Sequence, residues 1–133
     1  MIKLEIYDCT LREGEQAAGA SFDKESRAKL CKELDEFGVD FIELGWPVAS
    51  KDILESFEDC SKIVRNAKIV AFGSTSINEK IEEDANLNSI LKSKAKYACI
   101  FGKTWIEHIE KQLKLTKEGN LKRIKDSISG NNK

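Results

Sequence analysis

The residues with the most chemical potential lie in one short stretch, Asp8–Gln16, which combines carboxylates, a guanidinium and an amide. A carboxylate such as Glu13 can bind a hard divalent cation through oxygen. The guanidinium of Arg12, next to it, can present a planar set of donors to a carboxylate or an oxyanion. The stretch therefore predicts either a site for a cation and an anionic ligand or a solvated polar loop.

Two later apolar segments add polar residues near their ends. Glu43 lies inside Phe41–Gly45, where an unpaired buried carboxylate would be costly, so it should face a polar cavity mouth, a metal ion or Arg12. Ser74 and Thr75 close another apolar segment, and their hydroxyls suit either a ligand carboxylate or the capping of a turn. The alternatives for Glu43 and those for Ser74 and Thr75 stay open on the sequence.

Alternating strand-like and helical patterns would position these residues. Strands are expected at 3–8, 41–44, 68–72 and 97–101, and helices at 23–37, 52–65, 84–94, 105–115 and 117–128. The near-continuous apolar character of the strands indicates parallel strands covered on both faces. In such folds the carboxyl ends of the strands and their loops hold the active site, which is where Arg12 and Glu13 fall.

The predicted fold class is α/β: four βα units that form the N-terminal half of a TIM (β/α)8 barrel, with parallel strand order 1-2-3-4. A complete barrel needs about 250 residues, and this chain has 133. A doubly wound open sheet is the alternative, and its strand order would reverse at a switch point. We expect the half-barrel domain to span residues 1–128 and residues 129–133 to form a flexible tail.

Composition narrows the classes of protein. Twenty-two basic residues balance 23 acidic ones for a net charge of −1, which argues against nucleic-acid binding. No apolar run approaches the roughly 20 residues that span a bilayer, and no basic, apolar leader opens the chain. Four cysteines without a CxxC pair are expected to be reduced thiols, and a cytoplasmic protein without a membrane partner is predicted.

Several motifs, in order along nearly the whole chain, resemble one enzyme family. YDCTLREGEQ at 7–16 is similar to the D-x-T-L-R-[DE]-G-x-Q signature of the isopropylmalate, homocitrate and citramalate synthases, the DRE-TIM metallolyases. GWP at 45–47, AFGST at 71–75 and IFGKTW at 100–105 are most similar to a citramalate-synthase-like branch. The resemblance implies a Claisen-type condensation in which acetyl-CoA, as co-substrate, adds to the keto group of a 2-oxo acid.

The resemblance also implies roles for individual residues. Arg12 would polarise the keto oxygen as the catalytic residue, Glu13 would bind a divalent metal (Mg, Mn or Zn), and Gln16 would lie in the acceptor pocket. The acceptor would be pyruvate, although homocitrate synthases share a glutamate at the position of Glu13 and leave 2-isopropylmalate or homocitrate as possible products. The other expected site residues are Glu43, Ser74 and Thr75 for substrate binding, with Asp8 supporting the metal site from behind.

The length of the chain leaves a second interpretation of its function open. The family takes two metal-binding histidines from a later barrel strand, and His108, on a predicted helix behind the fourth strand, cannot replace them. A metal is therefore expected to bind weakly if at all, and whether this chain is an enzyme by itself stays open. Either it belongs to an acyltransferase, or it is a truncated, inactive half-barrel that acts as a fragment or interaction module. Its open edges predict a homo-oligomer.

Overall fold

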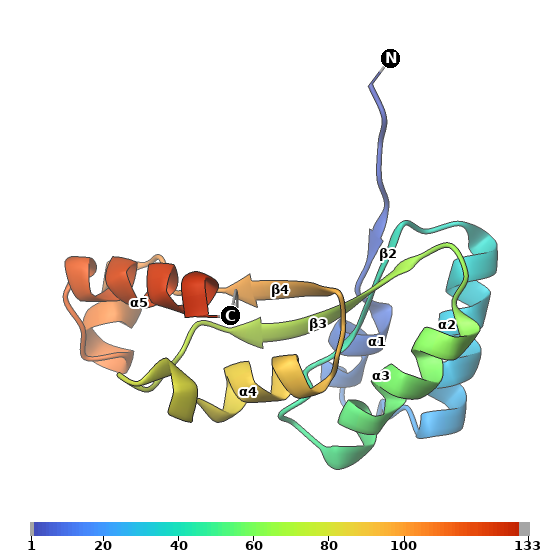
Figure 1. Cartoon of the computed structure of the whole chain (residues 1–133), viewed down its shortest axis with the longest axis horizontal. Coiled ribbons are helices and arrows are strands. Elements are labelled where there is room, and N and C mark those ends of the chain that lie inside the picture. The colour runs from blue at the N-terminus through green and yellow to red at the C-terminus, as the bar shows by residue number, and fades with distance from the viewer. Residues whose placement is uncertain (1, 131–133) are drawn as a thin grey trace.

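The apolar segments form one parallel sheet in the computed structural model, which describes residues 2–130 (Figure 1). The strands are β1 (Tyr7–Asp8), β2 (Phe41–Gly45), β3 (Lys68–Ser74) and β4 (Tyr97–Phe101). They pair in the order β1-β2-β3-β4, and all three pairings are parallel. This sequential order confirms four βα units in half-barrel order and excludes a doubly wound sheet.

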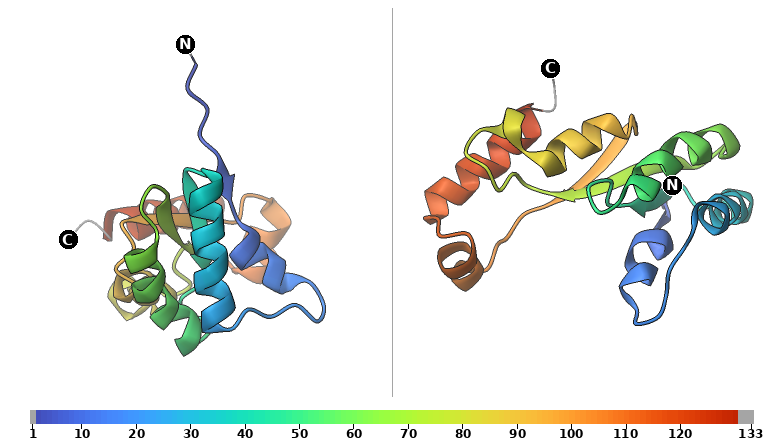
Figure 2. Two further views of the ribbon diagram at one scale, coloured as in Figure 1. Left: turned by 90° about the vertical axis from the view of Figure 1, so that its right-hand side faces the viewer. Right: turned by 90° about the horizontal axis from the view of Figure 1, so that it is seen from below.

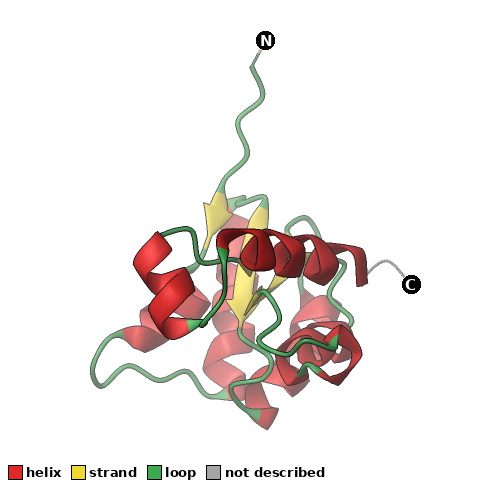
Figure 3. Cartoon of the chain, turned by 90° about the vertical axis from the view of Figure 1, so that its left-hand side faces the viewer, coloured by secondary structure: helices red, strands yellow, loops and turns green. Residues whose placement is uncertain are grey.

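Helices connect the strands and extend beyond the last one. Around the first crossover lie α1 (Thr10–Glu13), the short 3-10 turn η1 (Gly14–Gln16) and α2 (Lys24–Phe37); the later helical elements are α3 (Lys51–Ile63), η2 (Ile81–Glu83), α4 (Ala85–Lys92), the wide π-type turn η3 (His108–Gln112) and α5 (Lys117–Gly130). Figure 3 shows how these helices surround the short strands. None of the helices within residues 2–130 is both long enough and apolar enough to cross a bilayer.

Local sequence signals fix the ends of α2. The Asp23 carboxylate accepts a hydrogen bond of 2.8 Å from the backbone N–H of Ser26, which caps the first turn. Gly38 ends the helix with a φ of 96°, a left-handed conformation that costs glycine nothing, and its N–H donates to the carbonyls of Leu34 and Asp35. The helix therefore begins and ends where an acidic cap and a glycine predict it.

One face of the sheet forms the core against α2, α3 and α4, which lie along it in Figure 2. Ile42, Leu44 and Ala71 point to this face and are completely buried. Gly73 lets α4 approach closely, because a Cβ there would lie 2.5 Å from Cδ1 of Ile90. The helices therefore pack on the side that forms the outside of a barrel.

The opposite face carries an aromatic layer. Tyr7 stacks on Phe41 with ring centroids 5.9 Å apart, and Phe41 contacts Tyr97 edge-on at 5.8 Å. Tyr97 and Phe101 on β4 are exposed. The expectation that both faces are covered is therefore wrong for the described part of the chain, where these two rings of β4 are open to solvent.

Several predicted boundaries differ from the structure. Residues 3–6 are extended but lie outside β1: Ile6 bonds to Asp40 and Phe41 at the start of β2, whereas the segment before it projects from the molecule in Figure 1. Within Asp8–Gln16 there is no long loop: Asp8 ends β1, and α1 and η1 follow after Cys9. At the other end α5 continues through Gly130, two residues into the expected tail, and 131–133 lie outside the described residues.

Candidate active site

The junction of β1 and α1 places the site residues at the carboxyl end of the sheet. The Asp8 carboxylate accepts hydrogen bonds of 3.0 Å from both the N–H and the hydroxyl of Thr10, which starts the short helix. Leu11 is completely buried, and α1 contacts β2. Anchoring Leu11 in the core fixes its neighbours Arg12 and Glu13 at the rim.

A buried arginine holds this helix to the rest of the fold. Arg27 of α2 is 2% exposed, and its Nη1 donates to the carbonyls of Leu11 (3.2 Å) and Leu44 (2.9 Å). Its Nη2 forms an ion pair with Glu15. One guanidinium thus ties α2, the end of β2 and the α1–η1 segment together.

Arg12 is the centre of the site. Its Nε donates to Oε1 of Glu43 at 2.6 Å, and its Nη1 pairs with Oε2 of Glu13. Its guanidinium carbon lies 4.2 Å from the centroid of the Phe72 ring, a cation–π contact. Among the residues that the structure describes, Nη2 has no hydrogen-bond partner, so this nitrogen is available to a ligand oxygen.

Glu43 is the most deeply buried acid of the site, with 1% of its surface exposed. Its second oxygen, Oε2, accepts a hydrogen bond of 2.5 Å from the hydroxyl of Tyr7. Of the three surroundings open to Glu43 on the sequence, the structure therefore shows the pairing with Arg12. A carboxylate can be buried here because both of its oxygens have donors.

The Phe72 ring that contacts Arg12 is itself held by Trp46, which is hydrogen-bonded to Asn86. The indole of Trp46 contacts the Phe72 ring edge-on at 6.0 Å and donates to Oδ1 of Asn86 at 2.5 Å. The amide of Asn86 in turn donates to the carbonyl of Ser74 at 2.6 Å. The ends of β2 and β3 are thereby joined through α4.

The structure brings together some of the predicted site residues and separates others. Arg12, Glu13 and Glu43 are in direct contact. The two hydroxyl residues close β3, where the carbonyl of Ser74 is bound by Asn86 and the N–H of Thr75 donates to Phe101. Gln16 is exposed at the end of η1. Asp8 accepts from Thr10 and makes no contact with Glu13 among the described residues.

Sequence reasoning missed the residues that hold the site: Tyr7, Arg27, Phe72, Trp46 and Asn86. Strand alternation offered a signal for Phe72, which stands two residues before Ser74 on β3. Arg27 and Asn86 each lie on a helix, and nothing in the sequence pattern there predicts a role at the site.

The described residues form a partial metal site at Glu13. Glu13 offers one carboxylate oxygen beyond the one paired with Arg12. Within residues 2–130 no three histidine, cysteine, aspartate or glutamate side chains come together to hold an ion. Glu13 thus fits a divalent cation as a single ligand and needs further donors from elsewhere.

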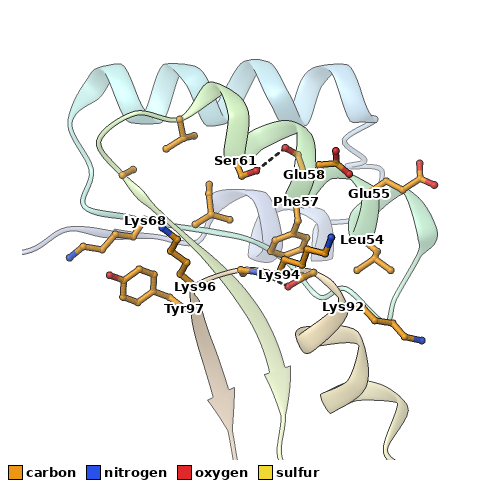
Figure 4. Close-up of a pocket in the computed structure, with 15 residues that line it drawn as sticks. Leu54, Glu55, Phe57, Glu58, Ser61, Lys68, Lys92, Lys94, Lys96 and Tyr97 are labelled. Atoms are coloured by element: carbon orange, nitrogen blue, oxygen red, sulfur yellow. Dashed lines mark hydrogen bonds between the residues drawn. The ribbon is translucent and has the colours of Figure 1, made fainter. Parts of the chain in front are cut away.

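A separate groove lies at the other end of the sheet, and none of the site residues lines it. It has a volume of about 710 Å³, with Leu54 and Phe57 of α3 on one side and Lys92, Lys94 and Lys96 around the turn into β4 on the other (Figure 4). Because β4 starts there, the groove is at the amino ends of the strands. Active sites of parallel barrels lie at the carboxyl ends, where Arg12 is found.

Sequential parallel βα units with an arginine–glutamate pair at their carboxyl rim define a half of a TIM barrel. A solved structure titled as HMG-CoA lyase of Bacillus subtilis has the same fold: it matches 96% of this chain and 42% of its own with a TM-score of 0.70 and 19% identity. The half-barrel fold is therefore shown independently of sequence similarity.

The chain belongs to the HMGL-like family, whose model matches residues 3–131. It is 41% identical over 128 residues to an (R)-citramalate synthase of Aquifex aeolicus and 30% identical over 129 residues to a 2-isopropylmalate synthase of Staphylococcus carnosus. These matches cover 95% and 97% of this chain but 24% and 25% of the two relatives. The chain thus spans about a quarter of their length, and the predicted family resemblance is confirmed.

Proposed function

We propose that this half-barrel is the part of an acyltransferase that binds a 2-oxo acid and directs its condensation with acetyl-CoA, with pyruvate as the first acceptor to test. The observation that carries the proposal is Arg12, fixed on three sides with Nη2 unpaired, next to Glu13 at the carboxyl rim. The similarity to (R)-citramalate synthase supports the choice of pyruvate.

The reaction assigns a clear task to Arg12. The acetyl methyl carbon loses a proton and bonds to the keto carbon, the keto oxygen takes up a proton as a hydroxyl, and water then cleaves the thioester to release CoA. Charge develops on the keto oxygen as the carbon–carbon bond forms. A preorganised guanidinium donor stabilises that charge more in the transition state than in the ground state. The proposed acceptor-binding residues are Ser74 and Thr75, at the carboxyl end of β3, and Gln16, at the end of η1.

Glu13 would hold one position of a divalent cation beside the acceptor. The chemistry such a cation supplies when bound is polarisation of the carbonyl. Because one carboxylate is a weak site, we expect Mn²⁺ to bind this chain only at roughly millimolar concentration. Glu13→Gln should abolish that binding, whereas Glu25→Gln, a change of the same kind on the exposed surface of α2, should leave it intact.

A second candidate function is a catalytically inactive half-barrel that serves as a fragment or an interaction module. It is favoured by the incomplete set of metal ligands in the described part of the chain and by the exposed aromatic layer. Both candidates share the fold, so only chemistry separates them.

Release of free CoA thiol from acetyl-CoA is the deciding measurement. The 133-residue protein is incubated with Mg²⁺ or Mn²⁺ and with pyruvate, 2-oxoisovalerate or 2-oxoglutarate in turn. Acceptor-dependent release that is lost in Arg12→Ala supports the acyltransferase. No release with any acceptor supports the inactive module, and equal release by Arg12→Ala contradicts the role of Arg12.

We also propose a cytoplasmic location and self-association. Cys31 and Cys60 are free, buried thiols on neighbouring helices, which suits a reducing compartment. β1 and β4 are unpaired edges of a parallel sheet, and such edges recruit further strands. For the isolated chain the available partner is a second copy.

A further inference from the structure

Tyr7 has no part in the proposed reaction, yet its hydroxyl contacts Glu43, the carboxylate that holds Arg12. It is opposite Phe41 in the pairing of β1 with β2, and the two rings stack. This placement carries the phenol toward β2, where the hydroxyl donates to Oε2 of Glu43 at 2.5 Å. The thiol of Cys99 on β4 is a further hydrogen-bond neighbour of the same hydroxyl.

The hydrogen bond from Tyr7 restricts the carboxylate that holds Arg12. The terminal torsion of a glutamate is broad, so a single contact leaves the carboxylate plane free to turn. With Tyr7 on Oε2, the other oxygen is directed at Nε of Arg12, 2.6 Å away. Glu13 on Nη1 and the ring of Phe72 complete the fixation, and Nη2 is left unpaired among the described residues.

We propose that Tyr7 is a positioning residue that acts through Glu43 to fix the guanidinium of Arg12 with Nη2 free for the oxyanion of a 2-oxo acid. The proposal rests on the proposed function for the identity of that ligand. The geometric part concerns only this chain, and it can be tested without turnover.

The protonation state of the phenol agrees with this role. Partial burial, followed by the hydrogen bond to the Glu43 carboxylate, raises the pKa of Tyr7 far above its ordinary value. A group with a raised pKa stays protonated at higher pH, so Tyr7 remains a donor throughout the neutral range. Tyr97, on the same face of the sheet, has no hydrogen bond to an acid and is the matched control.

Hydrogen exchange of the Arg12 Nε–H, followed by NMR, tests the proposal. The signal is assigned by its absence in Arg12→Lys. We expect Tyr7→Phe to speed this exchange by about tenfold or more, because the carboxylate loses its second anchor. Tyr97→Phe should leave the exchange unchanged. Unchanged exchange in a folded Tyr7→Phe would overturn the proposal, whatever the CoA assay shows.

A titration of phenolate absorbance in Tyr97→Phe, in which Tyr7 is the one tyrosine left, provides a second test that leaves Tyr7 unchanged. We expect Tyr7 to resist ionisation until the protein unfolds, because burial and the hydrogen bond to Glu43 raise its pKa. Ionisation of Tyr7 in the folded protein at the pH of an unperturbed tyrosine would show that Tyr7 is not held by Glu43 and would also overturn the proposal. Loss of CoA release with the Arg12 exchange intact would count against the proposed function instead.

Discussion

At the scale of single residues, the ion pair of Arg12 with Glu43 dominates the energetics of the site. Glu43 is almost completely buried, while the side chain of Arg12 keeps 18% of its surface exposed. Removing one member of a buried pair is costly chiefly because it strands the other charge in a poorly solvated place. The pair therefore constrains the fold as well as the chemistry.

Arg12→Met is expected to lower the free energy of unfolding by about 1–3 kcal/mol, less than for a fully buried pair because Arg12 is partly solvated. Replacing both partners, as in Arg12→Met with Glu43→Leu, should recover most of the loss since no charge is left stranded. Urea unfolding of the wild type and these variants measures the difference. Equal destabilisation in the single and double variants would contradict a stranded charge as the cause.

The sequence allowed Arg12, Glu13 and Glu43 to be predicted as site residues, because charged groups at the end of an apolar strand stand out. It did not reveal how they are held. The contact of Arg12 with Phe72 depends on the turn taken by α1, and the bond from Tyr7 to Glu43 depends on the register of β1 against β2. Neither is set by spacing along the chain.

At the scale of elements, buried polar side chains join the helices to the sheet. Arg27 reads on the sequence as one more basic residue of a solvated helix face, yet it binds the carbonyls of Leu11 and Leu44 and the carboxylate of Glu15. The capping residues of α2 could be predicted since their signals are local. The burial of Arg27 could not, because its partners come from distant segments.

Arg27→Met should destabilise the protein by roughly 2–4 kcal/mol, since the carbonyls of Leu11, Leu44 and Phe22 and the carboxylate of Glu15 each lose a donor. Lys29→Met is the matched control on the same helix: Lys29 is exposed and its only ion pair, with Glu33, spans 4.0 Å, so a change within about 0.5 kcal/mol is expected. Thermal or urea unfolding compares the two. Similar effects of the two substitutions would rule out the structural role of Arg27.

Asp84 makes α4 and the turn after β3 sensitive to acid. Its carboxylate accepts from the N–H groups of Leu87 (3.0 Å) and Ile77 (2.9 Å) and from the hydroxyl of Ser76 (2.9 Å). Burial alone would raise the pKa of Asp84, but the hydrogen bonds from Leu87, Ile77 and Ser76 outweigh it, and the pKa lies below its ordinary value.

A carboxyl whose pKa is lowered by folding stabilises the protein above its unfolded pKa of about 3.9 and loses that contribution as the pH falls through the lower, folded value. Stability should therefore fall on acidification below about pH 4. In Asp84→Asn the loss should already be present at neutral pH, and the further decline on acidification should be shallower. Urea midpoints recorded across the acid range check this, and an unchanged acid slope in the variant would contradict it.

At the scale of the whole molecule, the half-barrel leaves apolar surface that a complete barrel would cover. The segment before β1 exposes Ile2, Leu4 and Ile6 in alternation, and on β4 the rings of Tyr97 and Phe101 are open to solvent. The fold was predictable at this scale because four βα units in sequence admit few arrangements. The fate of the open edges was not, since it depends on chains beyond this one.

The isolated chain is expected to self-associate through these edges, with strands of a second copy adding beside β1. Light scattering should then give a mass above the 15.0 kDa of one chain, rising with concentration. Lysines at Ile2 and Leu4 place charge on the edge segment and should return the protein to a monomer, because charged side chains on an edge oppose strand addition. Phe37→Lys is the control: Phe37 is 82% exposed, close to the 83% of Leu4, but belongs to the helix α2 rather than to an edge strand. A wild-type mass of one chain at every concentration would show that the edges stay unpaired. If Phe37→Lys dissociates the protein as well as the edge lysines do, exposed apolar surface in general, rather than edge pairing, holds the copies together.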